Sequence, residues 1–227
     1  MSHSIHSQRP GHQVNLRILP DGKHLAPAAD QDIWGNVLKY MTVPHENWLP
    51  KFVDRIPSNG MVVDCGAFIG DHAQQFCSLG FETIAIEPFL DAFVCLCYNS
   101  PKSRNILGSA GDGRPCKLVY DCPGTNHGMR SVIHSDDGLP SILVDELGLK
   151  RLDFLKIDVE GFEPFVLDGA MDSISTFKPL MFVEANQEAL QRQGWNTAML
   201  EARIRGLGCK MEMVGGHPRW DWLCSFD

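Results

Sequence analysis

The sequence lacks any apolar run that approaches the ~20 residues of a membrane-spanning helix. Its first 12 residues are polar and include three histidines, so they do not resemble a secretory signal. Both absences favour a cytoplasmic protein with no membrane segment.

Positive charge is also scarce. The 227 residues include 20 lysines and arginines against 28 aspartates and glutamates, which gives a formal net charge of −8. Because phosphates dominate the affinity of nucleic-acid binding, this balance argues against a broad nucleic-acid surface, although a local basic groove stays compatible with it. A small or carbohydrate-like substrate fits the composition better.

No Cys-x-x-Cys pair is present. The eight cysteines lie in apolar contexts such as 94–97, and Cys116 with Cys122 has neither the spacing nor the nearby histidines of a zinc site. These contexts favour buried free thiols over disulfides, and we expect no bound metal.

The length suits one well-buried domain with a short N-terminal addition. We expect residues 1–56 to form this addition and residues 57–227 to form the domain. Residues 1 to about 30 show no periodicity and predict a loosely ordered segment, whereas 32–56 has helical spacing that Pro44 and Pro50 divide into two short helices. The addition could be a lid over an acceptor pocket or the arm of a homodimer.

From residue 57 onward, short apolar runs alternate with amphipathic stretches. The alternation predicts an α/β fold with a largely parallel, doubly wound sheet and helices on both faces. The expected strands are 61–65, 83–87, 105–109, 116–120, 153–158 and 180–184; the expected helices are 71–79, 90–98, 142–147, 163–171 and 197–205. Two last runs, 209–214 and 221–226, predict a closing antiparallel hairpin.

A glycine-rich turn follows the first of these strands, where residues 62–71 read V-V-D-C-G-A-F-I-G-D. Small residues at such a turn let a ligand approach the backbone. Asp64 would repel a pyrophosphate but attract the ammonium of a methionine moiety, which favours a sulfonium nucleoside over a dinucleotide. An ordinary strand-to-helix turn is the plainer interpretation.

Glu87 stands about 20 residues after this turn, at the expected end of the next strand. A carboxylate in that place can accept hydrogen bonds from both hydroxyls of a ribose. Phe89 could offer an apolar face to adenine. Glu87 could instead only cap the following helix, but with Asp64 upstream we favour cofactor binding.

Residues 153–164 read D-F-L-K-I-D-V-E-G-F-E-P, an apolar strand that ends in crowded carboxylates with one lysine. Such crowding is unfavourable for folding, so a site that uses the charges is the better explanation. Asp158 should face the methyl group of the cofactor, where it could orient the nucleophile or accept its proton.

These motifs, together with F-L-K-I-D-V-E-G-F-E-P-F-V-L-D-G-A at 154–170, resemble the FkbM family of methyltransferases. The similarity runs from about residue 60 to the C-terminus and is strongest in the last motif. It implies a seven-stranded, Rossmann-like sheet and O-methylation with S-adenosylmethionine. The residues expected to bind the cofactor are Asp64, Gly66, Ala67, Phe68, Gly70, Glu87, Pro88, Phe89, Ala110, Asp112 and Asp158; Asp112 would lie near the adenine.

By the same resemblance Lys156, Asp158 and Glu160 would lie at the reacting centre, and Glu184 would line the acceptor pocket. Asn126, His127 and Ser131 form a polar loop on the route to the acceptor, or a solvated connection. His72 could serve as an acceptor-side base, but a surface or capping role is as plausible.

The chemistry expected of this site is O-methylation of a hydroxyl on a sugar, glycan or small metabolite. Asp158, Glu160 or Glu184 would remove the proton, and Lys156 would stabilise the alkoxide. Lys156, Asp158 and Glu184 also resemble part of the set used by ribose 2′-O-methyltransferases of RNA, but no second lysine can be placed. A third alternative is a protein that binds the cofactor without catalysis.

Overall fold

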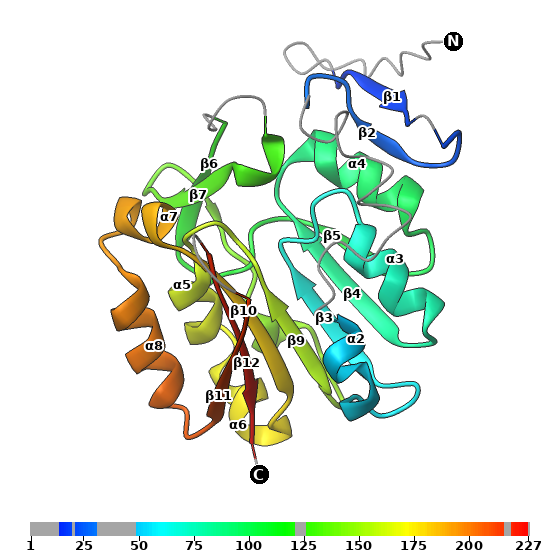
Figure 1. Ribbon diagram of the computed structural model, residues 1–227. Coiled ribbons are helices and arrows are strands. Elements are labelled where there is room, and N and C mark those ends of the chain that lie inside the picture. Colours follow the sequence, from blue (N-terminus) through cyan, green and yellow to red (C-terminus); the bar gives the residue numbers. More distant parts are fainter. Residues whose placement is uncertain (1–13, 20, 31–48, 121–125, 216–218, 227) are drawn as a thin grey trace.

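The computed structural model describes residues 14–19, 21–30, 49–120, 126–215 and 219–226 (Figure 1). The helical segment expected over 32–48 and Cys122 lie outside these ranges. Among the described residues, no helix has the length and apolarity to cross a bilayer. The seven described cysteines are all free thiols; Cys65, Cys95, Cys116 and Cys224 are buried, whereas Cys97 is exposed.

The centre of the fold is a seven-stranded sheet in the order β11-β12-β10-β9-β3-β4-β5. Its strands are β3 (Met61–Cys65), β4 (Glu82–Glu87), β5 (Arg104–Leu107), β9 (Phe154–Ile157), β10 (Leu180–Asn186), β11 (Lys210–Gly215) and β12 (Arg219–Ser225). Five strands are parallel, and β12 pairs antiparallel with both β10 and β11. The predicted α/β class and closing hairpin are therefore confirmed.

The order of the strands reverses between β3 and β9. From β3 the chain adds β4 and β5 on one side, and then returns to add β9 and β10 on the other. The carboxyl ends of β3 and β9 are therefore neighbours at the position where open parallel sheets bind their ligands.

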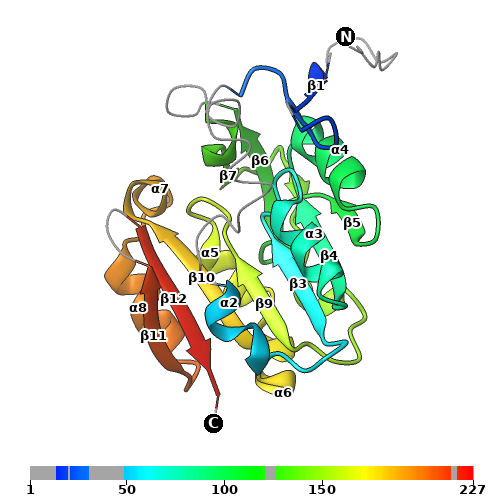
Figure 2. The ribbon, with the colours of Figure 1, turned by 45° about the vertical axis from the view of Figure 1, so that its right-hand side comes forward.

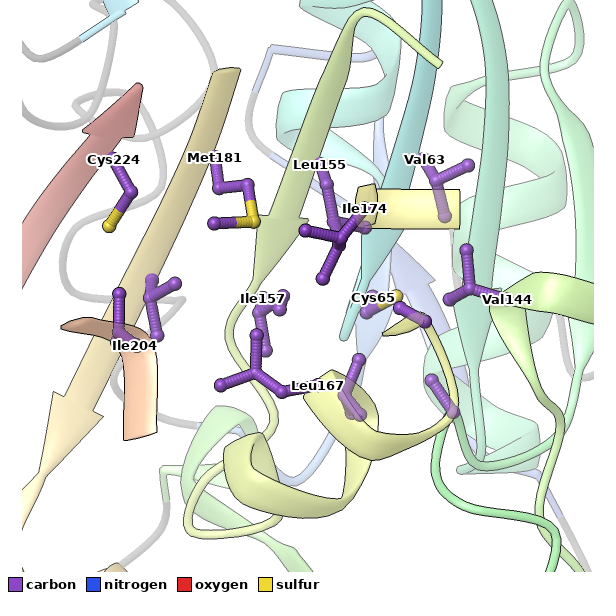
Figure 3. Close-up of a cluster of buried hydrophobic side chains, with 14 of the residues drawn as sticks. Val63, Cys65, Val144, Leu155, Ile157, Leu167, Ile174, Met181, Ile204 and Cys224 are labelled. Atoms are coloured by element: carbon purple, nitrogen blue, oxygen red, sulfur yellow. The ribbon is translucent and has the colours of Figure 1, made fainter. Parts of the chain in front are cut away.

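Successive side chains along each strand point to opposite faces of the sheet. Val62 and Phe154 pack with Phe52 and Phe76 from the side of α2 (Leu49–Phe52) and α3 (Asp71–Ser78). The adjacent residues, such as Val63 and Leu155, point to the opposite face. There they meet α5 (Glu163–Asp168), α6 (Met171–Phe177) and α8 (Thr197–Arg205) in the larger core cluster (Figure 3).

Two of the expected helices differ in the structure. Residues 163–171 form α5 and α6 instead of one helix, with the break at Gly169. A Cβ at Gly169 would lie 1.8 Å from the carbonyl oxygen of Gly111, so the chain needs glycine at this close approach. Residues 142–147 contain only a short 3₁₀ turn, η3 (Val144–Glu146).

The strand expected at 116–120 exists, but it belongs to a different sheet. β6 (Pro115–Val119) pairs antiparallel with β7 (Ser131–His134) and β8 (Leu139–Pro140) in a separate three-stranded sheet. This small sheet lies at the upper left in Figure 1, apart from the central one. The expectation of a place in the parallel sheet is wrong because β6 pairs with β7 and β8 and with no strand of the central sheet.

The N-terminal segment is more ordered than its composition predicts. β1 (Leu16–Ile18) and β2 (Leu25–Pro27) form a hairpin whose apolar side chains pack against Ile69 and Cys95. Asn99, at the end of α4 (Leu90–Asn99), accepts a hydrogen bond from the Leu25 amide at 2.8 Å and donates to the Ile69 carbonyl at 2.7 Å. These contacts hold the hairpin against Ile69 of the glycine-rich turn, and Figure 2 shows β1 next to α4.

Candidate functional site

The glycine-rich turn connects β3 to α3 and lies against the end of β9. Gly66 has φ +81°, and a Cβ there would lie 1.8 Å from the carbonyl oxygen of Asp158. The amides of Gly66 and Ala67 both donate to the Ile86 carbonyl at 3.0 Å. Only glycine at position 66 lets the backbone run this close to Asp158, so the turn joins the ends of three strands.

Glu87 closes the turn from the side of β4. Its carboxylate is buried and accepts hydrogen bonds from the amides of Phe68 at 3.0 Å and Phe89 at 2.8 Å. Burial raises the pKa of Glu87 to about 7, against the opposing effects of the Phe89 amide and the charge of Arg130. Glu87 therefore holds the turn together and can be ionised at neutral pH.

Lys156 is the centre of the charged cluster. Its Nζ lies 3.2 Å from Asp64 Oδ1, 3.1 Å from Asp158 Oδ2 and 3.3 Å from the Gly66 carbonyl oxygen. Burial disfavours the ammonium, but the carboxylates of Asp158 and Asp64 outweigh burial and raise the pKa of Lys156. One buried cation thus links the ends of β3 and β9.

Asp64 and Asp158 differ in their access to solvent. The Asp64 side chain is fully buried; its Oδ1 faces the Lys156 ammonium, and its Oδ2 accepts no hydrogen bond from the described residues. Burial raises the pKa of Asp64, and Lys156 and His72 offset this only in part. The Asp158 side chain keeps 23% of its exposure, so it is the member of the cluster that a ligand can reach.

Three carboxylates gather where β9 and β10 end. One oxygen from each of Asp158, Glu160 and Glu184 lies within 4.8 Å of the other two, and Asn186 donates to Glu160 at 3.2 Å. Oxygens so arranged suit either proton transfer or a hard cation. No second feature of the described residues indicates a cation, so the absence of a metal stays a prediction.

Glu163 belongs to this region, although sequence reasoning assigned it no role. Its Oε1 accepts hydrogen bonds from the amides of Val159 and Gly161 at 3.3 and 3.0 Å, and its side chain is buried. Burial raises the pKa of Glu163 to about 8, and the neighbouring charges of Glu160 and Asp158 add to the shift. The sequence places Glu163 before Pro164, at the start of a helix, but it does not show that the Glu163 side chain is buried.

Replacing Glu163 by glutamine should flatten the dependence of stability on pH. A carboxyl whose pKa is higher in the folded state loses stability as pH rises from its unfolded pKa, about 4, towards about 8. Glu163→Gln should therefore gain a few kcal/mol over the wild type at pH 8 and little at pH 5. Urea denaturation at both pH values measures this difference, with exposed Glu146→Gln as the control; equal changes at both pH values would contradict the assignment.

Asp112 has partners of its own. It accepts from Arg114 Nε at 2.7 Å and lies 3.2 Å from His134 Nε2. Burial works against the charge, but these hydrogen bonds lower the pKa of Asp112 below its usual range. Ala110, two residues earlier, is buried and bridges to Ile142. The structure therefore separates Asp112 from the lysine cluster, and its contact with adenine stays a prediction.

The expected acceptor-side residues divide into two groups. Asn126, His127 and Ser131 lie together, because Asn126 accepts from the Gly128 amide at 3.0 Å and begins a short turn, η2 (His127–Met129), that leads into β7. His72 lies apart from them on α3, where it packs near Phe76 and influences Asp64.

Phe89 has partners that the sequence did not indicate, and its contact with adenine stays a prediction. It is buried, the guanidinium of Arg130 lies 4.2 Å above its ring centroid, and Tyr120 contacts it edge-on at 5.3 Å. One face of the ring is therefore already covered by Arg130, which sequence reasoning did not single out. No sequence pattern indicated this residue because the contact joins segments about 40 positions apart.

Comparisons with known proteins agree with this architecture. A family model described as the methyltransferase FkbM domain matches residues 130–211. The crystal structure of methyltransferase FkbM from Methylobacillus flagellatus KT is similar with a TM-score of 0.52 at 17% identity, over 86% of this chain and 60% of that one. The chain thus spans less than two thirds of that relative. No curated protein sequence matches it.

Two further solved structures share the fold. A TehB-like SAM-dependent methyltransferase from Corynebacterium glutamicum ATCC 13032 has a TM-score of 0.51 at 10% identity, over 88% of this chain and 99% of that one. The fibrillarin pre-rRNA processing protein of Methanococcus jannaschii has a TM-score of 0.50 at 12% identity, over 76% and 68%. At these identities the likeness concerns the fold alone. Residues 130–211 match the methyltransferase FkbM domain, in agreement with the resemblance of the sequence motifs to the FkbM family.

Proposed function

We propose that the chain transfers the methyl group of S-adenosylmethionine to a hydroxyl of a sugar, glycan or other small metabolite. The observation that carries this proposal is the cluster at the ends of β3, β9 and β10, where Lys156 holds Asp158 beside two further carboxylates. The FkbM domain and the methyltransferase fold support the same class of reaction.

The residues around the glycine-rich turn fit the cofactor. Each oxygen of Glu87 accepts one backbone hydrogen bond and keeps acceptor capacity for a ribose hydroxyl. Asp64 is fully buried and paired with Lys156, so its contact with the methionine moiety stays a prediction of the sequence. At Gly66 the absence of a side chain lets the turn lie against the Asp158 carbonyl, at the end of β9.

Bound S-adenosylmethionine supplies an electrophilic methyl group, and the protein must align a hydroxyl with it. Asp158, the accessible carboxylate of the cluster, would orient this hydroxyl and accept its proton. Glu160 and Glu184 lie close enough to share that proton. The negative charges of the three groups favour proton uptake as the oxygen attacks.

The surroundings of Lys156 favour a role other than the stabilisation of an alkoxide, which the sequence suggests. Its ammonium has three donors, and three oxygens already lie within 3.3 Å of it. A fully buried ammonium with these partners is poorly placed to reach an alkoxide. We therefore assign Lys156 to positioning Asp158, which accepts the hydroxyl proton as the oxygen attacks, so that no free alkoxide has to form.

Incubation with methyl-labelled S-adenosylmethionine tests the proposal. The protein is mixed separately with pools of glycans, small alcohols and RNA, and label is expected in the glycan or small-alcohol pool. Label in the RNA pool, with binding that weakens steeply with salt, would support the ribose 2′-O-methyltransferase instead. Cofactor binding without label in any pool would support a non-catalytic protein.

A further inference from the structure

Arg130 connects the proposed ribose site to the polar loop on the acceptor side. It precedes β7 and is buried, with 6% of its surface exposed. Besides its stacking on Phe89, its Nη1 donates to Asp91 Oδ2 at 3.0 Å and its Nη2 lies 2.9 Å from Asp91 Oδ1. Phe89 and Asp91 stand two and four residues after Glu87, so the Arg130 side chain holds the start of α4.

The backbone around Arg130 is itself held in place. Arg130 Nε donates to the His127 carbonyl at 2.9 Å, and the His127 amide donates to Asp30 Oδ2 at 2.9 Å. Asp30 is fully buried at the end of the N-terminal hairpin segment. The segment 126–131 is therefore anchored on both sides, and Arg130 has little freedom to leave Phe89.

We propose that Arg130 is a positioning residue for cofactor binding, which keeps Glu87 ready for the ribose hydroxyls and couples that binding to segment 126–131. The inference rests on the proposed function, because it takes Glu87 as the ribose ligand. Arg130 itself contacts Phe89 and Asp91 and acts through them and through its charge.

The charges around Glu87 explain why the position of Arg130 affects cofactor binding near neutral pH. Burial raises the pKa of Glu87 to about 7, the charge of Arg130 lowers it, and Asp91 raises it. Three further titratable groups lie in this neighbourhood: His127, with Nδ1 3.5 Å from Asp91 Oδ2, Cys95 and Tyr120. An ionised carboxylate accepts a hydrogen bond at both oxygens, so affinity for the ribose should rise as pH passes through about 7.

The test is the pH profile of S-adenosylhomocysteine binding, measured by calorimetry between pH 5.5 and 9. Arg130→Met removes the cation and should move the midpoint up by about one pH unit, with binding at pH 6.5 about five- to tenfold weaker and near-normal at pH 9. Asp91→Asn removes the anion and should move the midpoint down. Opposite shifts are a result that a purely structural role cannot produce.

Two controls make the outcome decisive. Glu87→Gln should abolish the pH step, and Arg205→Met, in an exposed ion pair with Glu201, should leave the profile unchanged. Uniform weakening without a shift in both Arg130→Met and Asp91→Asn would overturn the role of Arg130, as would an unchanged step in Glu87→Gln. If Arg130→Met does not fold, Asp91→Asn alone tests the role of Arg130: a downward shift of the binding midpoint supports it, and no shift or an upward shift overturns it. A wild type that binds no S-adenosylhomocysteine at any pH would overturn the proposed function itself.

Discussion

Asp158→Asn is expected to lower the rate of methyl transfer by about 10²- to 10⁴-fold, the usual contribution of a general base. Asparagine keeps the size of the side chain and can still accept a hydrogen bond from Lys156, but it cannot take up the proton of a hydroxyl. Because Asp158 is 23% exposed and the cofactor turn is held by other groups, the affinity for S-adenosylmethionine should change only a few-fold.

The measurement is single-turnover transfer with the acceptor found in the labelling experiment, beside calorimetric binding of the cofactor. Asp136→Asn, an exposed carboxylate in a turn remote from the cluster, is the matched control and should transfer at the wild-type rate. Undiminished turnover in Asp158→Asn would refute the assignment. A large loss of cofactor affinity in Asp158→Asn would show that Asp158 binds the cofactor instead of acting as the general base.

Lys156→Met should destabilise the fold by about 3–5 kcal/mol at pH 8, because removal of one partner leaves a buried charge uncompensated. Methionine fills a similar volume, so the loss reports the missing charge more than a cavity. Asp64 is fully buried and depends on Lys156 as its ion-pair partner. The exposed surface variant Lys102→Met should stay within about 0.5 kcal/mol of the wild type.

The pH dependence of this loss identifies its source. Without Lys156, the pKa of Asp64 rises further above its unfolded value of about 4, so the folded variant keeps a proton that the unfolded chain releases. Its stability should then fall as pH rises, and the deficit should be smaller at pH 5 than at pH 8.

A double variant separates the ion pair from other effects of Lys156. Lys156→Met with Asp64→Asn removes both charges and should recover part of the lost stability at pH 8. Urea denaturation gives the values for a double-mutant cycle. A Lys156→Met protein as stable as the wild type at pH 8, or a double variant that is less stable than the single one, would contradict the electrostatic role.

Local patterns predicted the elements of the central sheet well. The expected strand 61–65 and helix 197–205 coincide with β3 and α8, and the other parallel strands differ by one or two residues at an end. These elements carry strong periodicity and are bounded by glycine, proline or capping residues. Asn196, for example, caps α8 by accepting from the Met199 amide at 2.9 Å.

The errors occurred where long-range contacts override local pattern. β6 has an ordinary strand sequence, and nothing in it shows that its partners are β7 and β8. The N-terminal hairpin has no periodicity of its own, because its order comes from packing on α4 and from the hydrogen bonds of Asn99. The hydrogen bond from the Leu25 amide to Asn99, for example, joins residues 74 positions apart.

By itself, the sequence determined the α/β class, the resemblance to the FkbM family and the strand ends at which the charged residues stand. Those features follow from short-range periodicity and from motifs whose members are close in the chain. Only the tertiary structure decided the partners of each charge: Lys156 between Asp64 and Asp158, Glu163 buried beneath the acidic turn, and Arg130 on Phe89. Burial and pairing depend on which segments the fold brings together, and they set the pKa values and hence the chemistry available to each residue.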